Sequence, residues 1–402
     1  MNPEPLLSIF IPTKNGTSTI ASAIESCLSN KRPDLEVIVH DCSDDDQIKQ
    51  FVDRNWQHES RLKYYYSEKN LSMTDNFNEA LSKCSGRYVC GIGDDDAVLQ
   101  NIMSIVDWMD INGIESVKQP MTNYFWPSPK ALSLFNGKLR YSKIFDGHVY
   151  NMDIKRNFIK ITHNCGFGYV EGLPSVYHAI VKLEPIQIHY KKTGHFFRGT
   201  SFDVYCACTL PTYLNNTYRI NIPFSIFGAG PNSNTMKNIN AESLDSHYDD
   251  FSQVGDFSYL PKLRNSNIST TESFIEALLD TGQAQLIDSM NLAVLFGKCA
   301  AESPSLTLGL ARHFISVTKK KFSLFYFLYY FLFYMFKNLR LNFKNFMIDV
   351  FAKTFPTIFD TVVKKYSKSR IVSAIDINEA VRILNKEIVL SDINLDSILI
   401  ER

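Results

Sequence analysis

The chain has 402 residues, 45% of them hydrophobic, so it is long enough to bury one large core or two smaller ones. Lysine plus arginine and aspartate plus glutamate number 42 each, a balance that gives no overall attraction to nucleic acid or another polyanion. The eight cysteines contain no Cys-x-x-Cys pair and the first residues lack a secretory signal, so we expect a cytoplasmic, reducing location without a zinc site or disulfide framework.

Short apolar runs and amphipathic segments alternate through the first hundred residues. We expect strands at 6–11, 35–39, 62–66 and 87–92, and helices at about 19–29, 48–52, 74–84 and 101–109. This alternation predicts βαβ units and a mainly parallel sheet. Ligands of such sheets bind where the carboxyl ends of the strands open, so Asp41 and the acidic run after the fourth strand are expected to face one crevice.

The run Gly93-Asp94-Asp95-Asp96 follows the fourth strand. Three carboxylates at the end of a buried strand need a compensating positive charge. Oxygen ligands on a tight loop suit a hard divalent ion, Mg²⁺ or Mn²⁺, which would in turn neutralise a phosphorylated ligand. The alternative for an acidic triplet taken by itself is a solvated turn.

Three further motifs precede this run, and the four stand in a fixed order. They are 8–15 (Ser-Ile-Phe-Ile-Pro-Thr-Lys-Asn), 37–43 (Val-Ile-Val-His-Asp-Cys-Ser), 76–81 (Asn-x-Asn-x-x-Leu) and 93–96 (Gly-Asp-Asp-Asp). The ordered set resembles the nucleotide-binding half of family-2 glycosyltransferases with the GT-A fold, such as bacterial surface-polysaccharide glycosyltransferases. It implies a Rossmann-like α/β N-terminal domain with a mainly parallel sheet.

The resemblance also implies site residues and a cofactor. The implied nucleotide-sugar-binding residues are Pro12, Thr13, Asn15, Asp41, Asp94 and Asp95. Asp94 and Asp96 of the DxD-type loop are the implied ligands of Mn²⁺ or Mg²⁺. Lys14 stands where many relatives have tyrosine, and His40 where many have a second aspartate, so the base of the nucleotide is left open.

Asp203 follows Gly199-Thr200-Ser201-Phe202 and lies 107 residues after Asp96. Ser201 or Thr200 is expected to cap a helix that starts near Asp203, where an acidic side chain is favourable in any case. Inverting members of the family carry their catalytic base on a helix start at about this distance from the acidic loop. The resemblance therefore implies that Asp203 is the catalytic base.

Other polar and aromatic residues give weaker signals. Trp126, before Pro127, is a candidate for stacking on an acceptor sugar, with loop packing as the alternative. Residues 226–235 are interpreted as a flexible Gly/Asn loop and a candidate lid. His178 and the other histidines lack metal-ligand spacing and are interpreted as structural or surface residues.

The remaining chain is predicted to be helical. We expect the GT-A domain at 1–240, a linker at 241–270 and a helical, membrane-associating region at 271–402 with helices at 272–279, 283–299 and 306–317. Residues 322–336 would span roughly 22 Å as a helix, which is short of the roughly 30 Å hydrocarbon core. Eight basic residues against one acidic between Arg312 and Lys353 favour a helix in the headgroup layer of an anionic leaflet, and a buried helix is the alternative.

The sequence thus predicts a metal-dependent, inverting glycosyltransferase (hexosyltransferase type) of polysaccharide biosynthesis, peripheral on the inner face of the cell membrane. It would transfer a sugar from a nucleotide-diphosphate sugar to a hydroxyl of a glycan or lipid-linked glycan acceptor. The alternatives are a nucleotidyltransferase, for which the loop from Pro12 to Gly16 is poor in glycine, and an inactive glycan- or nucleotide-binding module at the membrane. The donor, acceptor, linkage, oligomeric state and role of 356–402 are not predicted.

Overall fold

The computed structural model describes residues 4–128, 136–230, 257, 259–261, 263, 265–318, 323–354 and 369–390. Several predicted features lie outside these residues. They are the end of the candidate lid at 231–235, most of the predicted linker, Lys319 to Phe322, and most of the C-terminal segment from 356.

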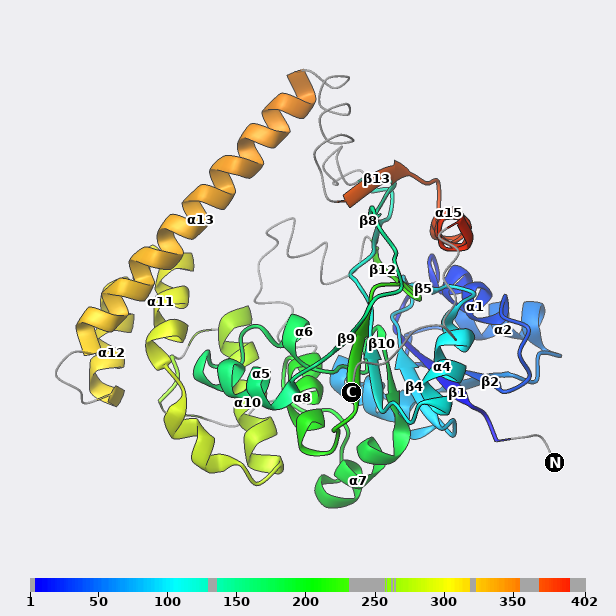
Figure 1. The fold of residues 1–402 in the computed structure, drawn as a ribbon, viewed down its shortest axis with the longest axis horizontal. Coiled ribbons are helices and arrows are strands. Elements are labelled where there is room, and N and C mark those ends of the chain that lie inside the picture. Colours follow the sequence, from blue (N-terminus) through cyan, green and yellow to red (C-terminus); the bar gives the residue numbers. More distant parts are fainter. Residues whose placement is uncertain are drawn as a thin grey trace.

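An eight-stranded sheet lies at the centre of the described residues (Figure 1). The four predicted strands are all present, and they pair in parallel with one another. β10 then pairs antiparallel with β4 and β6, so the sheet becomes mixed beyond its parallel half. Across the sheet the strands are β3 (Leu62–Tyr66), β2 (Leu35–Asp41), β1 (Leu7–Thr13), β4 (Tyr88–Gly91), β10 (Ala179–Lys182), β6 (Ser116–Lys118), β11 (Thr217–Ile220) and β9 (Val149–Asn151).

The register of the parallel half brings the predicted site residues to one edge. Thr13 of β1 lies opposite Asp41 of β2, and Phe10 lies opposite Gly91 of β4. After Gly91 the chain continues with Ile92, and the acidic loop begins at Gly93. The carboxyl ends of β1, β2 and β4 therefore open onto the same edge of the sheet, as predicted.

Helices cover both faces of this sheet. Ile9 and Ile11 of β1 point into a core shared with one set of helices, whereas Phe10 points into a core shared with the other, because side chains alternate along a strand. The first set is α1 (Ile20–Leu28), α2 (Gln47–Trp56) and α4 (Ile102–Ile111), and the second includes α3 (Met73–Ser82) and α7 (Leu183–Thr193).

A five-stranded sheet joins segments far apart in the sequence. Its order is β13 (Ser369–Ser373), β8 (Lys138–Ser142), β7 (Asn123–Phe125), β12 (Ser225–Ala229) and β5 (Ala97–Val98). After β13, α15 (Ile377–Leu390) packs beside β5 and α1, where the Asn378 amide donates to Glu25 at 3.0 Å. The chain therefore returns near its C-terminal end to the nucleotide-binding half.

A third core is helical. α10 begins at Ser266, inside the predicted linker, and packs on α8 with Phe274 and Leu278 fully buried. The division of the chain at 240 and 270 stays a prediction. The helices of this part are α5 (Ile154–His163), α6 (Tyr169–Gly172), α8 (Phe202–Thr209), α10 (Ser266–Asp280), α11 (Leu292–Glu302), α12 (Thr307–Thr318) and α13 (Ser323–Thr354).

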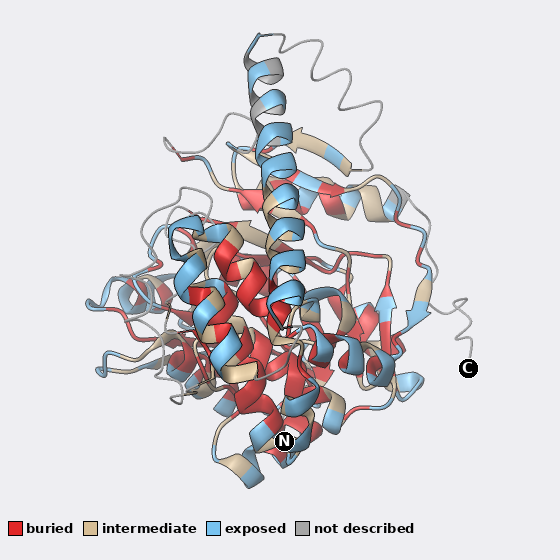
Figure 2. Ribbon diagram, turned by 90° about the vertical axis from the view of Figure 1, so that its left-hand side faces the viewer, coloured by how far each residue is buried: buried red, intermediate tan, exposed pale blue. Residues whose placement is uncertain are grey.

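α13 differs from its prediction in extent, because it has 32 residues where a helix ending at Phe336 was expected. Its first half packs on α11 and α12, with Phe327 fully buried, and its second half projects away from the other elements (Figures 1 and 2). Among the described helices none combines the length and apolar character of a membrane span. The predicted helix at 322–336 ended before the next basic residue, Lys337. In the structure the helix continues through Lys337 to Thr354.

A buried carboxylate under the parallel sheet gives a stability prediction. Glu36 of β2 is 1% exposed and accepts hydrogen bonds from Lys63, from the Ser8 hydroxyl and from the Ser85 amide and hydroxyl. Burial alone would raise the pKa of Glu36, but these donors hold it below its usual value. Glu36→Gln should lower the free energy of unfolding by about 2–3 kcal/mol at neutral pH, measured by urea denaturation.

The pH dependence follows from the lowered pKa. The contribution of Glu36 is complete above its unfolded pKa and is lost as pH falls through its native pKa, so the gap between parent and variant should be full above about pH 5 and shrink in acid. Glu79→Gln is the matched control, because its carboxylate is 51% exposed beside Lys83 and should change stability by less than about 0.5 kcal/mol. Equal losses in both variants would contradict the assignment.

Candidate functional site

The acidic loop connects the two sheets. Gly93 to Asp96 lie between β4 of the larger sheet and β5 of the smaller one. The three carboxylates are not equivalent, since Asp96 is buried whereas Asp94 and Asp95 are partly exposed. The loop therefore presents two carboxylates and keeps the third inside.

Asp96 is held by four donors. Its Oδ2 accepts from the Gly93 amide, from the Tyr177 phenol at 2.7 Å and from His178 Nε2 at 2.8 Å, and its Oδ1 accepts from the Gly228 amide at 2.6 Å. Burial alone would raise the pKa of Asp96, but the charge of His178 and the hydrogen bonds from His178, Tyr177 and the Gly93 amide hold it below its usual value. Its two oxygens are thus already occupied within the protein.

His178 connects Asp96 to a serine. Its Nδ1 lies 2.7 Å from Ser225 Oγ, and its ring stacks on Phe227 with centroids 3.6 Å apart. Carboxylate, imidazole and hydroxyl stand in the order of a hydrolase triad. All three side chains are buried, with Ser225 fully so, and no substrate reaches the hydroxyl in this arrangement. Of the two interpretations of His178, a structural or a surface residue, its burial fits the first.

Asp94 contacts the end of β1. Its Oδ2 accepts a hydrogen bond from the Thr13 hydroxyl at 2.5 Å. Gly16 leaves the space for this contact, because a Cβ there would lie 2.0 Å from the same oxygen. Burial, together with the charges of Asp96 and Asp41, raises the pKa of Asp94 to about 6.

Asp95 is held by the residues that follow β12 and β7. Its Oδ2 accepts from the Gly230 amide at 2.7 Å, and its carbonyl accepts from Trp126 Nε1 at 2.9 Å. Burial and the neighbouring carboxylates raise the pKa of Asp95 well above its usual value. Trp126, the candidate acceptor-binding residue, therefore braces the acidic loop, and its contact with a sugar stays a prediction.

The predicted nucleoside-binding residues lie at the ends of β1 and β2. Asp41 is fully buried, and its two oxygens accept from the Tyr64 phenol at 2.6 Å and the Ser43 amide at 2.8 Å. Asn15 has a left-handed backbone (φ 59°), donates from its amide to Ser43 Oγ at 2.7 Å and pairs its side chain with Asp44. Pro12, before Thr13, is buried. These residues are brought together as predicted. Asp41 itself is buried, and both of its oxygens are used in hydrogen bonds to Tyr64 and to the Ser43 amide.

Asp203 lies in the first turn of α8, as predicted, and it is partly exposed. Ser201 precedes the helix, but its side chain makes no capping hydrogen bond. The Tyr169 phenol donates to Asp203 Oδ2 at 2.5 Å. Burial raises the pKa of Asp203, and the hydrogen bond from Tyr169 opposes that rise.

Aromatic rings connect Asp203 to the acidic loop. The ring of Phe77 on α3 lies 4.1 Å from that of Phe202 and 6.1 Å from that of Tyr177, whose phenol donates to Asp96. The Thr74 hydroxyl, also on α3, donates to the Gly199 carbonyl at 3.0 Å. The start of α8 is therefore fixed against the same helix that borders the nucleotide-binding edge.

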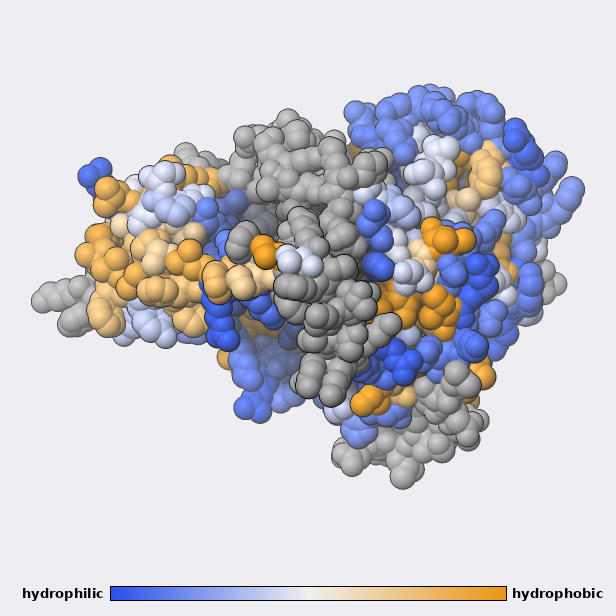
Figure 3. All heavy atoms as spheres, turned by 90° about the horizontal axis from the view of Figure 1, so that it is seen from above, coloured by the Kyte–Doolittle hydropathy of each residue, from blue (hydrophilic) through white to orange (hydrophobic). Residues whose placement is uncertain are grey.

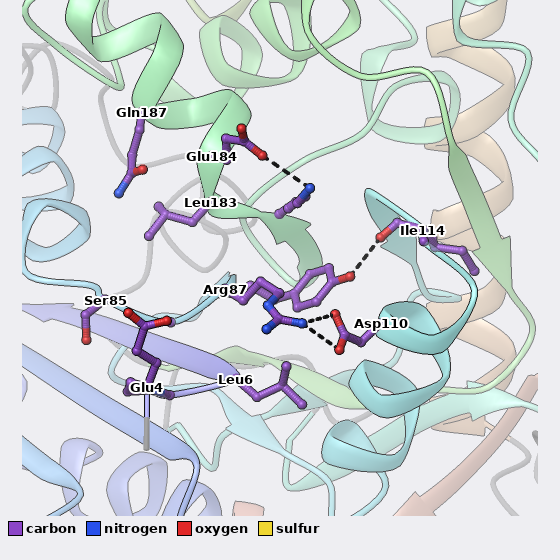
Figure 4. Close-up of a pocket in the computed structure, with 14 residues that line it drawn as sticks. Glu4, Leu6, Ser85, Arg87, Asp110, Ile114, Leu183, Glu184 and Gln187 are labelled. Carbon is purple, nitrogen blue, oxygen red and sulfur yellow. Dashed lines mark hydrogen bonds and ion pairs between the residues drawn. The ribbon is translucent and has the colours of Figure 1, made fainter. Parts of the chain in front are cut away.

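A pocket of about 580 Å³ lies elsewhere, at the amino-terminal end of the sheet (Figure 4). Arg87 and Asp110 pair across it, and the Tyr88 phenol donates to the Ile114 carbonyl. Because Leu6, Arg87 and Tyr88 stand before or at the starts of β1 and β4, this pocket lies at the edge opposite the acidic loop.

Within the described residues no cluster of three His, Cys, Asp or Glu side chains has metal-binding geometry.

Several residues of the site were not predicted. Tyr177 and Gly228 donate to Asp96, and Tyr169 donates to Asp203. The predicted flexible loop also begins as β12, whose Gly228 has room for no side chain because a Cβ would lie 1.7 Å from the Asp95 carbonyl oxygen. The glycines after Phe227 were the available sequence signal, and they mark close approach of two backbones.

Comparison with protein families gives one match to this part of the chain. Residues 8–167 match the model described as Glycosyl transferase family 2, which covers the acidic loop, Asp41 and α5. The predicted recognition and the GT-A fold class are consistent with this match and with the sheet order, and are confirmed.

Similar proteins share the N-terminal part. The GalNAc(5)-diNAcBac-PP-undecaprenol beta-1,3-glucosyltransferase of Campylobacter jejuni is 32% identical over 101 residues, 25% of this chain and 33% of the relative. The putative colanic acid biosynthesis glycosyl transferase WcaA of Escherichia coli is 33% identical over 107 residues, 26% of this chain and 38% of the relative. The matched parts therefore span about a third of these relatives. Staphylococcus aureus TarS (1–349) in complex with UDP-GlcNAc has a TM-score of 0.46 at 14% identity, covering 78% of this chain and 92% of that one.

The close approach at Gly228 predicts a local effect of a single methyl group. Gly228→Ala should displace the acidic loop and lower the melting temperature by several degrees, since overpacking costs about 1–3 kcal/mol. Gly309→Ala on α12 is the matched control, because nothing lies within 4 Å of its added Cβ and alanine favours a helix. The measurement is thermal unfolding followed by circular dichroism. A Gly228→Ala melting temperature equal to that of Gly309→Ala would contradict the close approach.

Proposed function

The chain carries a family-2 glycosyltransferase domain, and from this premise we propose that it transfers a sugar from a nucleotide-diphosphate sugar to a hydroxyl of a glycan or lipid-linked glycan. The observation that carries the proposal is the pair Asp94 and Asp95, presented at the carboxyl edge of the parallel strands while Asp96 is held inside. A lipid-linked acceptor is supported by the undecaprenol-linked substrate named for the Campylobacter relative.

The donor set fits a hard divalent cation. Asp94 and Asp95 are adjacent, partly exposed carboxylates, and oxygen ligands of this kind suit Mn²⁺ or Mg²⁺. The predicted pair was Asp94 and Asp96, and the four hydrogen bonds of Asp96 weigh against its second member. When bound, the cation would stabilise the charge of the departing diphosphate. Thr13 then orients Asp94, and the Gly230 amide orients Asp95.

Asp203 is proposed as the base. It lies in the first turn of α8, next to Phe202, whose ring packs on Phe77 of α3. In this proposal an acceptor hydroxyl approaches Asp203 from the side opposite the diphosphate. Removal of the hydroxyl proton by Asp203 allows attack from that side, which inverts the anomeric centre. The nucleotidyltransferase alternative lacks an observation in its favour, and an inactive module remains the outcome of a negative transfer assay.

Peripheral membrane binding through α13 belongs to the same proposal. Phe325, Phe336 and Phe343 are 68%, 62% and 67% exposed, and hydrophobic residues gather at this end of the molecule (Figure 3). Lys337, Arg340 and Lys344 are exposed on the same helix, and the sequence from 323 to 344 has no acidic residue. Exposed aromatic side chains beside basic ones fit an anionic leaflet, whereas pairing with a second copy would bring like charges together.

The metal-dependent donor site is tested by Asp94→Asn. A melting panel of UDP-, GDP-, dTDP- and CMP-sugars with and without Mn²⁺ should show one donor that stabilises the parent only with the cation. Asp94→Asn removes a proposed ligand and should weaken that binding by about 10- to 100-fold.

Asp110→Asn is the control for Asp94→Asn. The Asp110 carboxylate pairs with Arg87 at the opposite edge of the sheet, so its replacement should leave donor binding unchanged. Metal-dependent stabilisation that survives in Asp94→Asn would remove Asp94 from the cation site. A parent that no nucleotide sugar stabilises would refute the transferase proposal itself.

Membrane binding is tested by removing two exposed rings. Phe325→Ser with Phe336→Ser should weaken co-sedimentation with phosphatidylglycerol-containing vesicles by about tenfold or more, since burial of one such ring contributes about 1.5–3 kcal/mol. Ile111→Ser with Ile159→Ser is the matched control, at residues 79% and 69% exposed on other helices. Equal pelleting of both double variants, or a parent that forms dimers and ignores vesicles, would contradict the membrane role of α13.

A further inference from the structure

Tyr169 gives Asp203 a fixed hydrogen-bond partner. Its phenol donates to Oδ2 at 2.5 Å from the short helix α6, which contacts α8. A carboxylate at a helix start can rotate about its side-chain bonds, and a hydrogen bond to one oxygen restricts that rotation. The position of Asp203 therefore depends on the position of α6.

Two side chains hold α6 at its C-terminal carbonyl groups. Lys118 of β6 donates from Nζ to the carbonyls of Val170 and Leu173, at 2.5 and 2.8 Å. The Asn157 amide of α5 donates to the carbonyl of Gly172 at 3.0 Å. These carbonyls have no partner within a helix that ends there, so the donors satisfy them and tie α6 to the central sheet and to α5.

The turn before α6 is fixed as well. Cys165, Gly166 and Gly168 have positive φ angles of 56°, 90° and 95°. A Cβ on Gly166 would lie 2.9 Å from the Phe274 side chain, and the Thr271 hydroxyl donates to the Cys165 carbonyl at 3.0 Å. The turn is therefore packed against α10. The residue directly before α6 is Gly168, whose backbone conformation few residues other than glycine adopt.

We propose that Tyr169 and Lys118 are positioning residues for the base of the transfer reaction. Lys118 holds α6 in place, and Tyr169 on α6 holds one oxygen of Asp203, so that the other oxygen takes the proton of the acceptor hydroxyl. The inference rests on the proposed function, because it needs Asp203 to act as the base.

The charges around the carboxylate give the inference a readout. Asp203 is surrounded by Tyr169 on α6, Lys118 on β6, and Cys206 and Cys208 on α8. Lys118 in turn faces Glu171 on α6 and Arg219 on β11. On α10, which packs on α8, Glu276 and Asp280 are paired with Arg198. Burial raises the pKa of Asp203, while the Tyr169 hydrogen bond and the Lys118 charge lower it. Loss of either group should therefore raise that pKa further.

The test measures the pH profile of kcat for Tyr169→Phe and Lys118→Met. The assay follows hydrolysis of whichever UDP-, GDP-, dTDP- or CMP-sugar stabilises the parent most, with Mn²⁺ and with water in place of the acceptor. In both variants the acidic limb should move to higher pH, by roughly one unit, and kcat should fall by about tenfold at unchanged donor affinity. Lys118→Met gives the same readout if Tyr169→Phe fails to fold.

Two comparisons separate this inference from the proposed function. Asp203→Asn should lower kcat by roughly 10²- to 10⁴-fold, and adding Tyr169→Phe to it should cost nothing further, because the phenol acts through the carboxylate. Tyr88→Phe is the matched control, since it also removes a buried phenol, which donates to the Ile114 carbonyl at the opposite edge. Loss of activity in Asp203→Asn with parental pH profiles in Tyr169→Phe and Lys118→Met would overturn the positioning roles alone. Parental turnover in Asp203→Asn, or a parent without hydrolysis, would overturn the base role and with it the inference.

Discussion

The burial of one negative charge at Asp96 determines the geometry of the candidate site. Transferring a carboxylate from water costs several kcal/mol, and the cost is offset only when its oxygens are well hydrogen-bonded. Asp96 receives donors from the acidic loop, from the segment before β10 and from β12, each charge-assisted bond contributing about 1.5–3 kcal/mol. The same contacts join the two sheets. The loop that carries Asp94 and Asp95 is therefore anchored to both sheets through Asp96.

The conformations of the neighbouring residues follow from this requirement. His178 has a left-handed backbone (φ 52°), which is unfavourable for a residue with a side chain. That conformation brings its ring between Asp96 and Ser225 and against Phe227. Gly228 in turn lets β12 approach the loop closely enough for its amide to reach Asp96. Local backbone strain is thus retained at the point where the charge must be satisfied.

The part of the fold that follows from local patterns was predictable. The four parallel strands and the helices between them alternate with clear periodicity, and the ends of β1, β2 and β4 meet where the sheet rule requires. The partners of the carboxylates were not predictable, because His178 is 82 residues and Gly228 132 residues from Asp96. The extent of α13 was also missed, since those apolar side chains of its second half that the structure describes, such as Leu339, Phe343 and Met347, are exposed and give no core pattern that would mark a helix.

The packing of α13 on the helical core limits how this helix can be oriented. Its first half packs on α11 and α12, and the strand that follows it in the sequence, β13, pairs with β8 of the smaller sheet. β8 pairs with β7, next to which Trp126 donates to the Asp95 carbonyl. The segments before and after α13 therefore attach to the body that carries the acidic loop. If α13 binds a leaflet as proposed, the packing of its first half on α11 and α12 determines which side of the molecule faces that surface.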